Sequence, residues 1–269
     1  MQRVSTLTAA GVLVLGAAVA NGAAAQELPT TVSLFAVHAI NGLDLGLESE
    51  DATTVDVLVA PPEGSGEPTC VPEFGYGDVL GPVEIEVPEV PGDYTVSIFL
   101  PDADVECEGT PVASADVPVS ALGGTVLVVA GLDVGKTPFV ATFPVDASPL
   151  EDGFSRLSVV HAAVAPEVGI LIRDNDSGED VGGGSIENGE STLPLTLPEG
   201  SYRSFVSVTD PVDETTTTIT RGNFNLAAGI IGVGVLAGSV ENETAEVIRV
   251  EIEEEEEQTP PEPAANDTQ

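Results

Sequence analysis

The sequence predicts an all-β protein built from two related β-sandwich domains, and three observations support this. Val, Thr, Gly and Pro are abundant, whereas the helix-forming residues Lys, Arg, Gln and Met are scarce. Short apolar or alternating runs are separated by Gly, Pro, Asp and Asn clusters, and no long segment has an apolar stripe at helical spacing. The chain also repeats itself. Short strands with regular turn signals are typical of a sandwich.

The N-terminal residues predict a secretory signal peptide at 1–25. A positive charge at Arg3 precedes a short apolar run from Leu7 to Ala20, and the run closes on small residues that end at Ala25. The run is shorter than the roughly 20 residues of a membrane-spanning helix, and a buried N-terminal helix is the alternative. The apolar stretch 226–240 is also short and glycine-rich. We therefore expect a secreted chain with no membrane span after cleavage.

Charge is the most extreme feature of the composition. The chain carries 45 acidic and 7 basic residues, which gives a formal net charge of −38. Such a surface repels phosphates, so we expect no nucleic-acid partner and no anionic membrane partner. It suits a salty medium, where ions screen the self-repulsion of the carboxylates. A specific role in handling cations is the alternative interpretation.

The two cysteines, Cys70 and Cys107, predict one disulfide, because an exported protein lies in an oxidising compartment and the count is even. Closing a loop of this size contributes about 3–4 kcal/mol in the chain-entropy model. A metal-binding pair is the alternative, but neither histidine lies near either cysteine in the sequence.

The internal repeat appears as four pairs of segments in the same order. Segment 32–39, which ends in Val-His-Ala, matches 156–163, so His38 and His161 occupy the same place. The other pairs are 55–59 with 168–172, 91–98 with 199–206, and 124–131 with 229–236. Collinear matches indicate duplication of one folding unit. We expect Tyr94 and Tyr202, each just after a turn glycine, to begin a strand with the ring inward and the hydroxyl free to cap a loop.

These patterns define two domains, at 31–147 and 154–252, and a tail at 253–269 that we expect to be disordered because like charges and prolines cannot form a core. We expect strands near 31–39, 54–60, 82–88, 93–100, 112–119, 124–131 and 137–144 in the first domain, and near 155–163, 167–173, 191–197, 201–208, 215–224, 228–238 and 244–252 in the second.

The Val-His-Ala strand, the Val-Asp-Val-Leu-Val strand, the Pro-Gly-Asp-Tyr and Glu-Gly-Ser-Tyr turns and the run Gly-Thr-Val-Leu-Val-Val-Ala-Gly-Leu resemble a known family. They are similar to the tandem secreted domains of domain-of-unknown-function family 4397, over about residues 31–250. The resemblance implies antiparallel immunoglobulin-like sandwiches in an envelope protein. It supplies no catalytic residues. The cysteine pair and the acidic tail depart from its pattern.

His38 and His161 are the obvious candidates for catalysis, but a structural role is the better interpretation. No Gly-x-Ser-x-Gly nucleophile motif and no phosphate-binding Walker loop occurs in the sequence. Both histidines end an apolar strand at matched repeat positions, and one active site would not need both. We expect each to hydrogen-bond a neighbouring loop.

The segment 174–180 is the candidate metal site. Asp174, Asp176 and Asp180 alternate with other residues around a glycine turn, and such carboxylates can direct several oxygens at one Ca²⁺. The pattern departs from an EF-hand loop, and acidic strings arise easily by chance in so acidic a chain. The first repeat has no matching string, so we expect a loop insertion and no other cofactor.

Three function classes remain. The first is a non-catalytic secreted structural or interaction protein of the cell envelope, with an unknown extracellular partner. The second is an envelope binding protein for cations such as Ca²⁺, or for a small ligand. The third is a hydrolase whose site has no recognised motif. Export, duplication and the lack of a motif favour the first.

Overall fold

The computed structural model describes residues 31–49, 53–86, 92–100, 105–118, 124–209 and 214–253. Within these ranges the chain forms β-strands and one 3-10 helix, η1 (Gly42–Leu45). None of the helices in the described part is long and apolar enough to cross a membrane. The expected signal peptide at 1–25 and nearly all of the expected tail lie outside these ranges; Glu253, the first tail residue, ends the last strand.

Domain 1 is a sandwich of two four-stranded sheets. One sheet has the order β4 (Val79–Glu86), β1 (Thr31–His38), β7 (Gly124–Leu132) and β8 (Pro138–Val145). The other has the order β3 (Thr69–Gly75), β2 (Thr54–Ala60), β5 (Tyr94–Phe99) and β6 (Ala113–Val117). The side chains that face inward from both sheets form one apolar core.

Domain 2 repeats this arrangement strand for strand. One sheet has the order β12 (Leu195–Pro198), β9 (Phe154–His161), β15 (Ile230–Ala237) and β16 (Glu246–Glu253). The other has the order β11 (Asp180–Ile186), β10 (Val168–Asp174), β13 (Gly200–Thr209) and β14 (Thr216–Leu226). All pairs are antiparallel except β1 with β7 and β9 with β15. The predicted fold class of two tandem sandwiches is confirmed.

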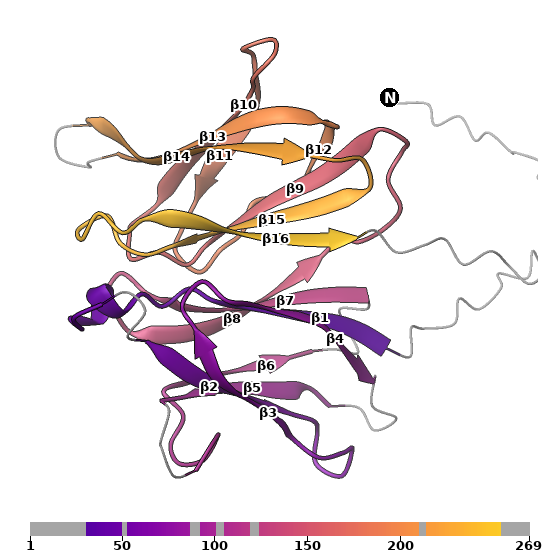
Figure 1. Cartoon of the computed structure of the whole chain (residues 1–269), viewed down its shortest axis with the longest axis vertical. Coiled ribbons are helices and arrows are strands. Elements are labelled where there is room, and N and C mark those ends of the chain that lie inside the picture. Colours follow the sequence, from indigo (N-terminus) through magenta and orange to yellow (C-terminus); the bar gives the residue numbers. More distant parts are fainter. Residues whose placement is uncertain are drawn as a thin grey trace, which may run out of the picture.

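The two domains pack sheet against sheet, so the molecule is a stack of four layers (Figure 1). The β4-β1-β7-β8 sheet faces the β12-β9-β15-β16 sheet, and a continuous apolar cluster fills the space between them. Leu127 and Val129 from β7 meet Val233 and Val235 from β15 there, and none of these side chains is more than 2% exposed. This contact explains why both strands are apolar without alternation, since a strand buried on both faces has no solvent side.

A polar contact closes one end of the domain interface. The buried carboxylate of Asp44, in η1, accepts a hydrogen bond of 2.7 Å from Nδ2 of Asn242, in the loop between β15 and β16. The hydroxyl of Thr244 lies 3.4 Å from the same carboxylate. The interface is therefore fixed by apolar packing and by a specific polar contact at its edge.

Two strands were not predicted. Both are edge strands, and each is the second strand of the equivalent hairpin in its domain. β3 contains Pro72, and β11 contains three consecutive glycines at 182–184. Proline and glycine are depleted in strand interiors, so neither segment had a strand pattern. The prediction of a loop insertion at 174–180 was wrong for the same reason, because both domains have a hairpin at this place.

The repeat is also shifted by one residue in its last segment. In β7, Ala130 pairs with His38, and in β15, Leu236 pairs with His161. Ala130 is therefore equivalent to Leu236, whereas the sequence match placed it one residue earlier. The match had aligned two turn glycines, Gly124 and the residue before β15. A slip of one residue matters, because it assigns every side chain to the opposite face of the sheet.

Candidate functional site

The two histidines end β1 and β9, and both are completely buried. Nδ1 of His38 accepts a hydrogen bond from the amide of Ile40 at 3.1 Å, and Nδ1 of His161 accepts one from Ala163 at 3.3 Å. The proton therefore lies on Nε2, which in His161 donates to the carbonyl of Pro166 at 2.9 Å. Each ring fixes the turn that leaves its strand, and neither faces solvent.

Burial makes the histidines sensitive to acid. It lowers the pKa of His38 from 6.5 to about 4 and also lowers that of His161. Above pH 6.5 both rings are neutral in the folded and unfolded chains. Below pH 6.5 the histidines become protonated in the unfolded chain, whereas the buried rings of the folded chain stay neutral to lower pH. The free energy of unfolding therefore falls.

We expect the free energy of unfolding to lose up to roughly 3 kcal/mol through His38 as the pH falls from 6.5 towards 4. Urea titrations across this range test the expectation on the wild type and on His38→Asn, whose Oδ1 can replace the Nδ1 acceptor without titrating there. The difference between the two proteins isolates the histidine from the surface carboxylates. A constant difference would contradict the prediction.

Tyr94 is the first residue of β5 and Tyr202 is the third residue of β13, and both are buried. The hydroxyl of Tyr202 donates to the carbonyl of Pro198 at 2.7 Å, which joins the start of β13 to the end of β12 in the opposite sheet. The ring of Tyr202 also stacks on Phe224, with centroids 5.8 Å apart. These contacts hold the corner of the sandwich.

Cys70 and Cys107 form the expected disulfide, which joins edge strand β3 to the loop before β6. A buried carboxylate, which the sequence did not reveal, supports it. Asp56 in β2 accepts hydrogen bonds from the amides of Glu73 at 3.1 Å and Cys107 at 3.2 Å. Both of those residues have positive φ angles, so Asp56 holds two unusual backbone segments beside the bridge.

The structure does not bring the expected calcium ligands together. Asp174 accepts hydrogen bonds from the amides of Asp176 and Ser177 and from the Ser177 hydroxyl, which keep its pKa below the usual range. Asp180 is paired with Arg173 at 2.6 Å. Among the residues described, no three His, Cys, Asp or Glu side chains are grouped to hold a metal ion. The carboxylates stabilise a hairpin turn.

We therefore expect salt to stabilise the protein without a calcium-specific effect. With a net charge of −38, screening of surface carboxylates should raise the melting temperature as NaCl increases from about 0.01 to 1 M. CaCl₂ at matched ionic strength should give the same curve. A further rise with Ca²⁺ that disappears in Asp174→Asn but persists in Asp152→Asn would identify a calcium site.

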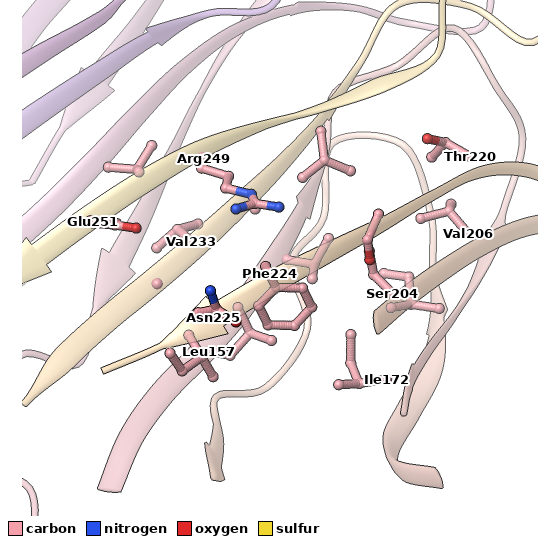
Figure 2. A pocket seen from close by; sticks show the side chains of 18 of the residues that line it. Leu157, Ile172, Ser204, Val206, Thr220, Phe224, Asn225, Val233, Arg249 and Glu251 are labelled. Carbon is pink, nitrogen blue, oxygen red and sulfur yellow. The ribbon is translucent and has the colours of Figure 1, made fainter. Parts of the chain in front are cut away.

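A hollow of domain 2 opens between its two sheets, where β14 and β16 form their edges (Figure 2). It has a volume of about 220 Å³. Its walls are mainly apolar and include Leu157, Ile172, Val206 and Phe224. In domain 1 the corresponding edge is covered, because β6 packs against β8.

A second opening enters the same domain from the opposite edge, between β11 and β12, with a volume of about 470 Å³. Both openings reach the same four apolar side chains, Leu157, Val159, Ile170 and Ile172. These four side chains therefore lie beneath both openings, and Leu157, Ile170 and Ile172 are no more than 9% exposed.

Arg249 lies at the first of these mouths. It projects from β16 with its guanidinium carbon 5.8 Å from the centroid of Phe224, and Nη2 donates to the carbonyl of Asn223 in β14 (Figure 2). The ion pairs of the described residues involve Lys136, Arg156 and Arg173, so Arg249 has no carboxylate partner there.

A third hollow, of about 640 Å³, lies between the domains beside the segment that connects them. Its basic residue is already occupied: Arg156 forms an ion pair of 3.0 Å with Asp146 and donates to the carbonyl of Ser148 at 3.2 Å. This arrangement ties the connecting segment to domain 2 and leaves no free cation for a ligand.

No family model and no curated protein matches the chain. Among solved structures it is similar to the Bacillus anthracis TIE protein, with 16% identity and a TM-score of 0.23; the match covers 77% of this chain and 34% of that one. A candidate cell adhesion protein from Bacteroides ovatus is 12% identical, with a TM-score of 0.21 and coverage of 82% and 97%. Candidate polysaccharide-binding proteins from Bacteroides thetaiotaomicron are 10% identical, with a TM-score of 0.22 and coverage of 83% and 99%.

Proposed function

We propose that the protein is a non-catalytic secreted interaction protein of the cell envelope, in which two domains act as one rigid body. The observation that supports this is the apolar core between the domains. Domains joined only by a flexible segment move relative to one another, whereas a large apolar interface fixes their orientation. The loops at both ends of the stack are then held at a constant separation, which suits display and adhesion. The resemblance to family 4397 agrees with this proposal.

The charge of the chain suggests the character of its partner. Carboxylates far outnumber basic groups, so the partner surface is neutral or positively charged, and association weakens as salt screens the attraction. Both buried histidines are remote from solvent, which also favours binding over catalysis.

Labelled protein, from residue 26 onward, should bind saturably to intact cells or envelope fragments of the source organism, and unlabelled protein should compete. Treatment of the fragments with protease or periodate distinguishes a protein partner from a polysaccharide. Absence of saturable binding would reject the proposal. So would turnover in a broad hydrolase screen that His38→Asn or His161→Asn abolishes.

A further inference from the structure

The internal repeat provides a comparison for the core of domain 2. The strand pairing that aligns Ala130 with Leu236 also aligns Val126 with Gly232 and Val128 with Gly234. Val126 and Val128 are buried in the core of domain 1. Their two counterparts have no side chain, and both line the opening between β14 and β16.

Two more core positions are reduced in the same way. Val71 and Gly184 pair with equivalent residues of β2 and β10, so they occupy the same place in the two domains. The same is true of Val96 and Ser204. Val71 and Val96 pack in the core of domain 1. Gly184 lines the opening between β11 and β12, and a Cβ atom added there would meet nothing within 4 Å.

Larger residues replace smaller ones at other positions: the same pairing aligns Ala36 with Val159, Ala130 with Leu236, Val57 with Ile170, Val59 with Ile172 and Val117 with Phe224. Leu236 is fully buried in the core of domain 2 and pairs with His161. The lost side chains lie along both openings, and so do Val159, Ile170 and Ile172, which are larger than their counterparts. The four positions that lose side-chain volume, Gly232, Gly234, Ser204 and Gly184, therefore each line one of the two openings.

The distance between the two openings follows from the sheet. Four strands at about 4.8 Å spacing place the two edges about 14 Å apart. Leu157, Val159, Ile170 and Ile172 lie between the two openings and supply an aliphatic lining. An elongated, unbranched apolar molecule fits this shape better than a broad ring system.

Arg249 adds a polar end to the space. Its guanidinium group stands at one mouth, and no described carboxylate lies within ion-pair distance of it, although the chain carries 45 acidic residues. Glu251 lines the same mouth but forms no ion pair with it. A guanidinium is well suited to a carboxylate or phosphate oxygen, because its donors match that geometry.

From these observations we infer that the interior of domain 2 is a binding site for an aliphatic chain with an anionic head group, with the chain between the sheets and the head at Arg249. This inference is independent of the partner proposed for the exterior. Domain 1 has the same fold with its valines in place and is the unliganded copy.

Dodecanoate is a suitable probe, and calorimetric titration of the full mature chain is a direct test. We expect saturable binding at one site per chain. Gly232→Val restores the side chain of the other repeat, and its Cβ would lie 3.4 Å from Leu157, an ordinary contact. This variant should melt no lower than the wild type and bind dodecanoate at least tenfold more weakly. Gly184→Val, at the other opening, should likewise melt no lower than the wild type and bind dodecanoate at least tenfold more weakly.

The head-group assignment needs a separate measurement. Arg249→Gln should weaken dodecanoate binding about tenfold and leave the neutral analogue dodecanol unchanged. Arg173→Gln, which changes an arginine on β10 that is paired with Asp180, is the matched control and should change neither. Equal losses of both ligands in Arg249→Gln would overturn the role of Arg249. The site itself is rejected if the wild type does not bind dodecanoate, or if Gly232→Val and Gly184→Val bind it unchanged.

Discussion

Leu127→Ala is expected to destabilise the protein by about 2–5 kcal/mol, the range for truncating a fully buried leucine. Leu127 lies in β7, is 0% exposed, and faces the second domain rather than the core of its own. The substitution removes apolar contact with the sheet of β15 and leaves a cavity, because the two backbones cannot close over the missing atoms. Urea-induced unfolding measures the loss.

The same experiment tests whether the two domains are one cooperative unit. Because the interface is as buried as either core, wild-type unfolding should be a single transition by calorimetry and by fluorescence of the tyrosines. Leu47→Ala is the control, since Leu47 is 43% exposed and its truncation should change stability by less than about 0.5 kcal/mol. Two separate wild-type transitions, or equal effects of the two substitutions, would contradict the rigid stack.

The sequence predicted the sandwiches well because strands in a core carry apolar side chains between clear turn signals. It failed where tertiary context decides. β3 and β11 each pair with one strand only, so Pro72 and the glycines at 182–184 are tolerated at these edges. The domain interface was not predicted, although the unbroken apolar runs of β7 and β15 indicate strands buried on both faces.

The candidate site was harder to predict than the fold. Asp174 and Asp180 looked like calcium ligands because spacing shows which carboxylates are near one another in the chain. The spacing does not show which carboxylates already accept hydrogen bonds within a turn or form an ion pair with Arg173. The glycines of β15 fall within the strand expected near 228–238, but their meaning depends on the register. Only the pairing of β15 with β9 shows that Gly232 stands where the first domain has a core valine.

Removal of the disulfide is expected to destabilise the protein by about 4 kcal/mol, given the separation of 37 residues between Cys70 and Cys107. The main cause is the larger conformational freedom of the unfolded chain. A folded-state effect adds to it, because Asp56 is 2% exposed and accepts a hydrogen bond from the amide of Cys107. If the loop moves away, this buried carboxylate loses a donor that water must replace.

The double variant Cys70→Ala/Cys107→Ala and the wild type treated with a reductant should therefore show the same lowered urea midpoint. Asp56→Asn in the oxidised protein separates the two contributions, because it keeps the bridge and weakens the acceptor for the amides of Glu73 and Cys107. It should cost about 1–3 kcal/mol by itself. In the double variant its further cost should be smaller, since the loop is already free; equal costs in both backgrounds would show that the carboxylate and the bridge act independently.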